Sequence, residues 1–172
     1  MTRVAIGFGS NLGERQDYIR GALRLLERVV AIEHVSSLYE TAPMYVEDQP
    51  SFLNGVVVGV TDLGPLSLVE ALKRIEAEVG RTPMQPNGPR EIDLDLLLYG
   101  RLVLNSIGAR HVSVPHPAMA SRRFVLEPLC EIAPDAFVPF LGPAEVLLER
   151  EGVQSQSVRR IEDAAVPVPS AK

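Results

Sequence analysis

The chain has 172 residues, a formal net charge of −5, and 46% hydrophobic against 23% charged residues. This balance is typical of an ordinary globular protein, and one domain of this length can bury a substantial core. No apolar run approaches the roughly 18 residues that a membrane-spanning helix needs. The acidic net charge disfavours broad nucleic-acid binding. We therefore expect a globular domain with neither a membrane nor a nucleic-acid partner.

The expected compartment is the cytoplasm. The first residues, MTRVAIGFGSNLGE, contain only a short apolar stretch and lack the small-residue cleavage pattern of a secretory signal. The lone cysteine, Cys130, excludes an internal disulfide, which suits a reducing environment. Its neighbours in LEPLCEIAPD are mostly apolar, so we interpret Cys130 as a core residue.

Hydrophobic periodicity predicts strands and helices along the body of the chain. In order, the expected elements are a strand at 3–9, a helix at about 14–30, strands at 31–41 and 52–62, a helix at 65–80 and a strand at 90–100. Asn11, followed three residues later by Glu14, resembles a capping box at the start of the first helix. Pro65 and Gly80 open and close the second helix, as the asymmetry of helix ends predicts.

The remaining segments predict loops and shorter elements. We expect loops at 42–51 and 81–89, a segment at 102–105 that pairs back with the strand at 90–100 through a turn at Gly100, a stretch at 111–135 that turns helical after Pro117, and a short helix at 142–152. From Gln154 onward the chain is polar, with prolines and alanines, which predicts disorder. Residues 1–153 would therefore form one domain, and residues 154–172 a disordered tail.

The order strand, helix, strand, strand, helix, strand is that of the split βαβ arrangement, so the predicted fold class is α+β and ferredoxin-like. Such a fold has one mainly antiparallel sheet with both helices packed on one face. The opposite face of the sheet would then remain free for a functional site.

The segment GPREIDLDLLLYG, residues 88–100, places two carboxylates inside an apolar strand. Side chains alternate between the two faces of a strand. The apolar face would hold Ile92, Leu94, Leu96 and Leu98, and the other face Glu91, Asp93, Asp95 and Leu97. Neighbouring carboxylates repel each other unless a positive charge lies between them, and Mg²⁺ meets that need while leaving positions for phosphate oxygens.

Two readings of this acidic face stay open on the strand pattern alone. Half-exposed antiparallel strands show the same alternation, so the face could simply be solvated. Arg90, directly ahead of the pair, suits a bound metal–phosphate group as a charge partner. It could equally form a salt bridge with Asp93 or Glu91.

Six blocks of the sequence, in order, resemble the 6-hydroxymethyl-7,8-dihydropterin pyrophosphokinase family of folate biosynthesis. They are IGFGSNLGE, SSLYETAPM, DQPSFLNGVV, RIEAEVGR, GPREIDLDLLLYG and VPHPAMASRRFVLEPLCEIAPD, and they cover roughly residues 4–140. The glycine-serine-asparagine turn, the strand with two aspartates and the VPHP block are highly specific in combination. The resemblance implies an enzyme that transfers pyrophosphate from MgATP to the hydroxymethyl group of the dihydropterin and releases AMP.

The resemblance also implies the residues of the site. Asp93 and Asp95 would hold two Mg²⁺ ions that bridge the ATP phosphates, and these aspartates with Arg81 and Arg90 would be the catalytic residues. The pterin pocket would be lined by Thr41, Ala42, Met44, Phe52, Asn54 and Phe124. The contacts with ATP would come from Glu76, Arg81, Arg90, Ser113, His116 and Arg122. Aromatic faces stack on a flat ring, an amide recognises the pterin edge, and guanidinium groups bind phosphate oxygens.

The implied mechanism needs no nucleophile from the protein. The substrate's own hydroxyl would attack the β-phosphorus, in line with AMP as the leaving group. The protein would supply positioning and charge neutralisation. The loops at 42–51 and 81–89 would close over the substrates and exclude water.

The chain departs from the family pattern just before the Gly-Pro-Arg segment. Many members carry a basic residue and then tryptophan where this chain has Pro86 and Asn87, so the resemblance does not extend to a tryptophan lid over the pterin or to some of the phosphate clamp. His111 stands where an arginine near the nucleotide can occur, and Pro117 where tyrosine can. We expect the activity to survive with altered loop energetics.

Two other functions are alternatives. A different metal-dependent nucleotidyl or glycosyl transferase could use the same aspartate strand, and a ferredoxin-like sensor could bind a small molecule without turnover. The sensor would tolerate the loss of Asp95, whereas the enzyme would not. For the enzyme, the expected partners are ATP and the dihydropterin, with no nucleic acid and no membrane, and the expected assembly is a monomer.

Overall fold

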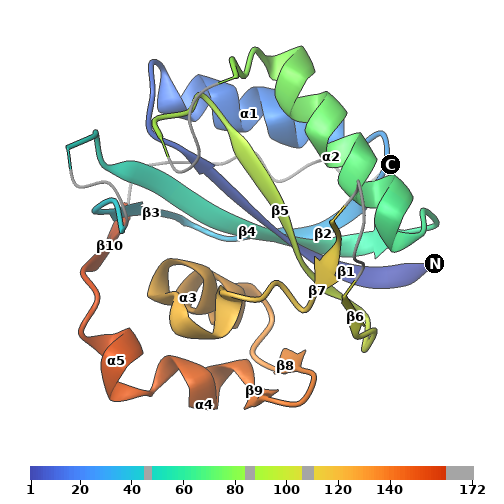
Figure 1. The fold of residues 1–172 in the computed structure, drawn as a ribbon, viewed down its shortest axis with the longest axis vertical. Coiled ribbons are helices and arrows are strands. Elements are labelled where there is room, and N and C mark those ends of the chain that lie inside the picture. The colour runs from blue at the N-terminus through green and yellow to red at the C-terminus, as the bar shows by residue number, and fades with distance from the viewer. Residues whose placement is uncertain (45–47, 84–87, 106–110, 162–172) are drawn as a thin grey trace.

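The computed structural model describes residues 1–44, 48–83, 88–105 and 111–161 (Figure 1). Its helices are α1 (Arg15–Leu26), α2 (Pro65–Val79), α3 (Arg123–Ile132), α4 (Ala144–Leu148) and α5 (Glu151–Gln154), with a short 3-10 helix at Met119–Ser121. Its strands are β1 (Thr2–Ser10), β2 (Ala31–Val35), β3 (Leu38–Thr41), β4 (Phe52–Thr61), β5 (Asp93–Tyr99), β6 (Leu104–Asn105), β7 (Ser113–Val114), β8 (Phe137–Val138), β9 (Gly142–Pro143) and β10 (Val158–Ile161).

One six-stranded sheet forms the centre of the molecule. Its strands follow the order β10–β3–β4–β1–β5, and β2 also pairs with β4. All of these pairings are antiparallel. The succession of β1, α1, β2 with β3, β4, α2 and β5 is the predicted ferredoxin-like order, so the α+β fold class is confirmed.

The strand predicted at 31–41 is divided into β2 and β3. The break falls at Ser36, a buried residue whose hydroxyl accepts a hydrogen bond from the Val56 N–H at 2.9 Å. The same hydroxyl donates to the carbonyl oxygen of Ser37 at 2.8 Å. The side chain thus competes with the regular ladder for backbone partners, which a pattern of apolar residues cannot reveal.

Helices cover both faces of the sheet (Figure 1). On one face α1 and α2 bury residues such as Ile19 and Leu72 against the sheet. On the other face α3 buries Val125, Leu126 and Leu129 in a second core that includes residues of β4. The prediction of a free opposite face is therefore wrong in part, because the apolar side of α3 needs a surface to cover. The uncovered part of that face remains available for a site.

A β-bulge at Leu97 interrupts the alternation of side chains along β5. Ile6 pairs with Leu96, but the next pair joins Ala5 to Leu98, so Leu97 is an extra residue on its strand. Leu97 and Leu98 consequently both join the core beneath α3. The prediction that Leu98 shares the apolar face of Leu96 is wrong, because one inserted residue reverses every later side chain.

Three local predictions also need correction. The segment at 102–105 does not pair back with β5, since β6 pairs with β7. The helix expected at 142–152 is two short helices, α4 and α5. No side chain caps the start of α1, and Asn11 makes its hydrogen bonds elsewhere.

The chain forms a strand where the sequence predicted a disordered tail from Gln154. Residues Val158–Ile161 make β10, which pairs antiparallel with β3. The sequence hid this strand because Arg159 and Arg160 interrupt its apolar pattern, and because its partner strand lies far away along the chain. The rest of the expected tail, residues 162–172, lies outside the described residues.

Cys130 packs at the border of the core beneath α3 rather than inside it. Burial, together with the charges of Glu145 and Glu127, raises the pKa of its thiol to about 11. The thiol is therefore protonated at neutral pH, as expected of a structural cysteine. Among the described residues, no helix has the length and apolar character needed to cross a membrane.

The close packing of β4 against the Phe8 side chain of β1 leaves no room for a side chain at position 55. A Cβ atom there would lie 2.3 Å from Cζ of the buried Phe8 ring. Gly55→Ala should lower the free energy of unfolding by about 1–3 kcal/mol, the usual cost of overpacking. Gly152→Ala is the matched control, since a Cβ atom at Gly152 meets nothing within 4 Å. Urea unfolding of both variants measures the difference, and equal stabilities would contradict the packing described.

Candidate functional site

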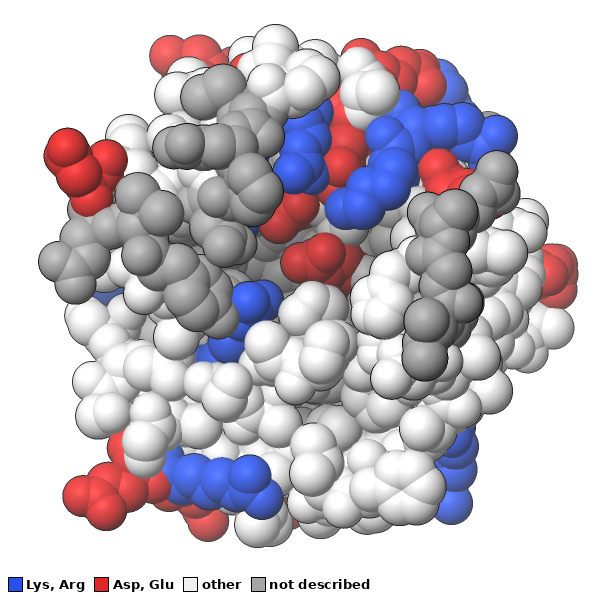
Figure 2. Space-filling view, viewed as in Figure 1, with Lys and Arg blue, Asp and Glu red and all other residues white. Residues whose placement is uncertain are grey.

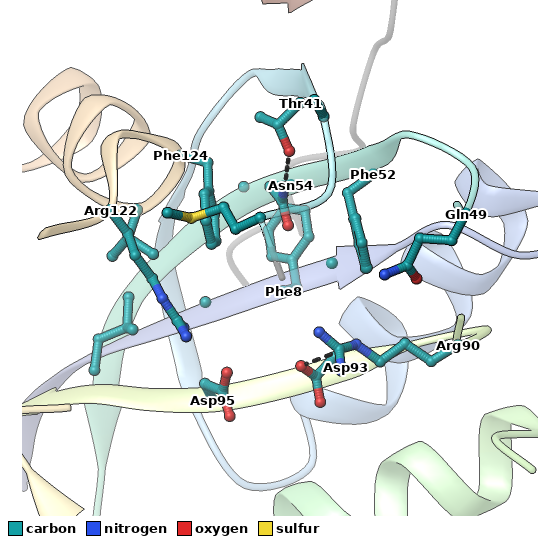
Figure 3. Close-up of a pocket in the computed structure, with 17 residues that line it drawn as sticks. Phe8, Thr41, Gln49, Phe52, Asn54, Arg90, Asp93, Asp95, Arg122 and Phe124 are labelled. Carbon is teal, nitrogen blue, oxygen red and sulfur yellow. Dashed lines mark hydrogen bonds and ion pairs between the residues drawn. The ribbon is translucent and has the colours of Figure 1, made fainter. Parts of the chain in front are cut away.

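A pocket lies on the part of the sheet face that α3 leaves open (Figure 3). All the residues predicted for the pterin pocket line it: Thr41, Ala42, Met44, Phe52, Asn54 and Phe124. They are joined there by some of the residues predicted for metal and ATP: Arg90, Asp93, Asp95 and Arg122. The fold therefore brings the two predicted groups together from segments far apart in the sequence.

The backbone of β1 at Gly7 and Gly9, which carry no side chains, forms the floor of the pocket. Gly7 pairs with Asp95 across the sheet, and Gly9 pairs with Asp93. A Cβ atom added to Gly9 would lie only 2.5 Å from Oδ1 of Asn54. Glycine at this position thus keeps the space between the carboxylates and Asn54 open, a role that the sequence analysis did not identify.

Two aromatic rings form the sides of the pocket. Phe52 and Phe124 lie on either side of Asn54 (Figure 3). The guanidinium carbon of Arg90 lies 5.2 Å from the centre of the Phe52 ring, and that of Arg122 lies 5.6 Å from the Phe124 ring. Both distances are those of cation–π pairs. The pocket thus suits a flat ring that is joined to a negatively charged group.

The amide of Asn54 has a fixed orientation. Asn54 and Thr41 are 7% and 5% exposed, and Nδ2 of Asn54 donates a hydrogen bond to Oγ1 of Thr41 at 2.7 Å. Its Oδ1 atom then lies toward Gly9 and the floor of the pocket. An Asn side chain held in this way offers one acceptor and one remaining donor to a ligand with a polar edge.

Three cationic side chains surround Asp93. Its Oδ1 accepts a hydrogen bond from Nη1 of Arg81 at 2.7 Å and lies 3.9 Å from Nζ of Lys73, while Oδ2 lies 3.3 Å from Nε of Arg90. Burial acts to raise the pKa of Asp93, but the charges of Arg90, Lys73 and Arg81 outweigh it and hold the pKa below its ordinary value. Asp93 is therefore ionised and already neutralised by its neighbours.

Asp95 is in the opposite situation. Within the described part of the chain it forms no hydrogen bond or ion pair. Burial, and after it the negative charge of Asp93, raise the pKa of Asp95 above its ordinary value, and Lys73, His116 and Arg122 offset this only in part. Figure 2 shows acidic and basic side chains gathered around a hollow in this face. Asp95 is thus a partly buried carboxylate that a further cation would stabilise.

The donor set fits a hard divalent cation. Carboxylate oxygens are the ligands that Mg²⁺ prefers, and it commonly takes one or two of them together with substrate phosphates. Among the described residues, no group of three or more His, Cys, Asp or Glu side chains could hold a metal by itself. A cation at Asp93 and Asp95 would therefore need ligands from a bound substrate or from water.

Glu76 supports this arrangement from behind the strand. It is 3% exposed, and its oxygens accept hydrogen bonds from Nζ of Lys73, Nη1 of Arg81 and the N–H of Leu94, each at 2.7 Å. Both oxygens are thus engaged within the protein. Glu76 thus holds Arg81 and Lys73 beside Asp93, and its contact with ATP stays a prediction. The part of Lys73 was not predictable, because the helical pattern does not show that its side chain lies beside Glu76 and Asp93.

Asn11 joins two loops at the mouth of the pocket. Its Nδ2 donates to Oε1 of Gln49 and to the carbonyl oxygen of Pro50, both at 3.0 Å. Its Oδ1 accepts from the N–H of Arg90 at 2.8 Å, and its own N–H donates to the carbonyl oxygen of Arg90 at 3.1 Å. Gln49 also lines the pocket, and it was not predicted, because its contact with Asn11 joins residues 38 positions apart in the sequence.

The other predicted ATP contacts lie beside the pocket rather than in its lining. Ser113 belongs to β7, which is paired with β6. His116 is held by its N–H, which donates to the Leu97 carbonyl at 2.9 Å, and by Nδ1, which accepts from the N–H of Ala118 at 3.2 Å. Burial lowers the pKa of His116, although the charge of Asp95 acts in the opposite direction. No hydrogen bond of its Nε2 atom to another described residue is seen.

Of the four positions that depart from the family pattern, the structure describes two. Pro86 and Asn87 lie outside the described residues. His111 and Pro117 are both exposed, and neither lines the pocket.

The fold and the site together define an α+β domain with an aromatic pocket that opens onto a charged floor. A profile of the family "7,8-dihydro-6-hydroxymethylpterin-pyrophosphokinase (HPPK)" matches residues 5–134. The Bacillus subtilis protein named 2-amino-4-hydroxy-6-hydroxymethyldihydropteridine pyrophosphokinase is 46% identical over 135 residues, which are 77% of this chain and 79% of that one. The Pseudomonas aeruginosa protein of the same name is 43% identical, over 80% of this chain and 84% of that one. The chain therefore belongs to the 7,8-dihydro-6-hydroxymethylpterin-pyrophosphokinase family.

Some relatives are much longer proteins. The Folic acid synthesis protein fol1 of Schizosaccharomyces pombe is 41% identical over 157 residues, which are 90% of this chain but 21% of that protein. The chain likewise spans 23% and 25% of the Arabidopsis thaliana and Pisum sativum relatives, each named Folate synthesis bifunctional protein, mitochondrial. The chain thus spans a quarter or less of these fungal and plant relatives.

Solved structures agree with the fold. The crystal structure of Plasmodium falciparum HPPK-DHPS with SDX-DHP superposes with a TM-score of 0.70 at 16% identity, over 85% of this chain and 43% of that chain. The structure with pteroate gives a TM-score of 0.71 at the same identity. At such low identity the likeness concerns the fold alone.

The buried position of Glu76 generates a prediction about stability. Glu76→Ala should lower the free energy of unfolding by about 2–3 kcal/mol, because Arg81, Lys73 and the Leu94 N–H would lose their shared acceptor. Glu78→Ala on the same helix is the control, since Glu78 is 54% exposed and pairs with the exposed Arg28. Its loss should cost under about 1 kcal/mol. Urea unfolding compares the two, and equal losses would contradict the supporting role of Glu76.

Proposed function

We propose that this domain transfers a pyrophosphoryl group from ATP to the hydroxymethyl group of 6-hydroxymethyl-7,8-dihydropterin and releases AMP, as a step of folate biosynthesis. The observation that carries the proposal is the opening of an aromatic pocket directly onto Asp93 and Asp95. Membership of the pyrophosphokinase family supports the same reaction. A ring bound in the pocket would hold its substituent above the carboxylates.

The pterin would occupy the pocket between Phe52 and Phe124. Its flat ring matches the two aromatic faces, and burial of such faces contributes strongly to binding. Its polar edge would meet Asn54, whose Nδ2 already donates to Thr41 and whose Oδ1 faces the floor. The fixed amide would choose one orientation of the ring, so that the hydroxymethyl group points toward Asp95.

The triphosphate would lie along the charged side of the pocket. Arg90 and Arg122 line that side, and Arg81 lies against Asp93. Guanidinium groups bind phosphate oxygens with two parallel hydrogen bonds, which fixes geometry as well as charge. We propose that His116 joins them through Nε2, the ring nitrogen that its local hydrogen bond leaves over.

Asp93 and Asp95 would hold two Mg²⁺ ions together with ATP, and bound Mg²⁺ supplies neutralisation of phosphate charge and polarisation of the transferred group. For Asp93 to bind Mg²⁺, some of its ion pairs with Lys73, Arg81 and Arg90 must break. Arg81 and Arg90 can do so by turning to the phosphate oxygens, which replace the carboxylate as their partner. Asp95 needs no such exchange, because no described side chain pairs with it.

The reaction requires positioning rather than a protein nucleophile. The hydroxyl oxygen of the substrate attacks the β-phosphorus, and AMP leaves from the opposite side. Holding both substrates in line is the main contribution that a protein makes to such a transfer. Asp93 and Asp95 lie on β5, and Arg122 directly precedes α3, so these groups are held on regular elements of the fold.

We also propose that the domain acts in the cytoplasm as a monomer. The presence of a single cysteine, Cys130, supports a reducing compartment such as the cytoplasm. Neither ATP nor the dihydropterin requires a membrane or nucleic-acid partner.

The activity is tested by mixing the protein with MgATP and 6-hydroxymethyl-7,8-dihydropterin and separating the nucleotides by chromatography. AMP should form in equal amount to the pyrophosphorylated pterin, and none should form without the pterin. Release of ADP would contradict the proposal, since it would mean transfer of a single phosphoryl group. The absence of any nucleotide product would contradict it as well.

The acidic pair is tested by Asp95→Ala in the same assay. The variant should lose on the order of a thousandfold in kcat, the scale expected when a key electrostatic group is removed. It should remain folded, because Asp95 supports no hydrogen bond in the described structure. Asp62→Ala is the control, since Asp62 is 75% exposed and pairs with the N-terminus. Near-normal turnover by the Asp95 variant would favour a solvated acidic face.

A further inference from the structure

A cluster of four polar residues lies behind the ring pocket, on the α1 side of the sheet. Oε1 of Glu40 accepts hydrogen bonds from Nη1 and Nη2 of Arg15, at 3.2 and 3.3 Å, and from Oγ of Ser51 at 3.1 Å. Its Oε2 accepts a hydrogen bond from Nη2 of Arg159. Arg15, Glu40, Ser51 and Arg159 are called the Glu40 cluster below.

The Glu40 cluster holds the two chain segments that present the ring-binding residues. Glu40 directly precedes Thr41, and Ser51 directly precedes Phe52. Thr41 and Phe52 are paired across β3 and β4, and they are the last pair before the loop that joins the two strands. Nη1 of Arg15 also donates to the backbone carbonyl of Ser51 at 2.9 Å. The cluster therefore fixes the distance between the end of β3 and the start of β4, where Thr41 and Phe52 are paired.

The charges of the cluster are matched. Glu40 and Arg15 have side chains 24% and 30% exposed, so neither is fully hydrated. Hydrogen bonding from Arg159, the largest influence, holds the pKa of Glu40 below its ordinary value, and Ser51 and Arg15 act in the same direction. Carboxylates bound by several charged donors form stronger hydrogen bonds than neutral groups do.

One member of the cluster comes from the C-terminal strand. β10 pairs with β3, with Arg159 opposite Glu40 and Val158 opposite Thr41 (Figure 1). Without β10, β3 would be the edge of the sheet, with unpaired backbone groups beside the pocket. β10 also lies beyond residues 5–134, the segment that the family profile matches. The match to the family profile therefore does not include this strand.

We propose that Glu40 and Arg159 are positioning residues for the pterin, and that β10 is a structural part of its pocket. The inference rests on the proposed function for the identity of the ligand. Neither side chain touches the ring, because both lie on the far side of the sheet. They act by holding Thr41 and Phe52 in the arrangement that binds the ring, so that binding does not have to order these segments.

Neighbouring arginines of β10 provide a matched pair of variants. Arg159 bonds to Glu40, whereas Arg160 bonds to Ser37 and to Glu131 of α3. Both side chains are largely exposed, at 70% and 59%, so either substitution should leave the protein folded. Arg159→Ala should raise the KM for the dihydropterin about threefold, the scale of one exposed charge pair. Arg160→Ala should leave it unchanged.

Glu40→Gln tests the centre of the cluster. It keeps the size of the side chain but removes its charge, and the KM for the dihydropterin should rise about tenfold. In Glu40→Gln and Arg159→Ala, the KM for ATP and the value of kcat should change by less than about twofold, since the reacting groups do not move. Arg159→Lys should recover part of the loss. Loss of kcat, or equal changes in the KM of both substrates, would indicate general destabilisation and overturn the inference.

Binding without turnover separates this inference from the proposed function. Calorimetric titration with 6-hydroxymethyl-7,8-dihydropterin should show the same order of affinities: wild type and Arg160→Ala highest, then Arg159→Ala, then Glu40→Gln. If wild-type protein binds the pterin but forms no AMP, the proposed function fails while the titration still tests the cluster. If AMP forms and all four proteins bind the pterin equally, the inference about the cluster fails alone.

Discussion

Two carboxylates on one face of β5 are the constraint on which the rest of the structure depends. Asp93 and Asp95 point into a pocket where water is limited, and like charges at that spacing repel each other. The protein resolves only half of the problem: Lys73, Arg81 and Arg90 surround Asp93, while no described side chain pairs with Asp95. The folded domain therefore holds an incomplete charge arrangement. We propose that a divalent cation and a polyanionic nucleotide complete it together.

The surrounding elements keep that arrangement open and rigid. Glycines of β1 leave the floor without side chains, and α3 covers only part of the sheet face. Behind the strands, buried polar groups set the positions of the working residues: Glu76 holds Arg81, and Asn11 ties Gln49 to the Arg90 segment. Each of these groups is satisfied by several hydrogen bonds, because a buried polar side chain without partners would cost more than it stabilises. A framework of hydrogen-bonded polar groups behind the strands therefore supports the residues that line the pocket.

Local patterns predicted the fold class and the shared face of Asp93 and Asp95, and the family resemblance implied most of the other pocket residues. Neither indicated the buried polar groups that support the pocket. Period-two alternation placed Asp93 and Asp95 on one face correctly, and helix-end signals placed Pro65 and Gly80 at the ends of α2. The same alternation failed at Leu98, because the bulge depends on the register with β1. Asn11 resembled a helix cap, yet its partners lie 38 and 79 residues away along the chain. β10 resembled a disordered tail for the same reason, since its stability depends on a distant edge strand. Contacts between distant segments decided each of these cases.

The central claim is that the site is completed by divalent cations held at Asp95 and Asp93 together with the nucleotide. It is tested most directly by a crystal structure with Mn²⁺, a non-hydrolysable ATP analogue and the pterin, in which anomalous scattering locates the metal. We predict metal peaks roughly 2 Å from carboxylate oxygens of Asp95 and Asp93, with phosphate oxygens as further ligands and Arg81 turned from Asp93 to the phosphates. Nucleotide bound in the pocket with no metal peak at either aspartate would contradict the account.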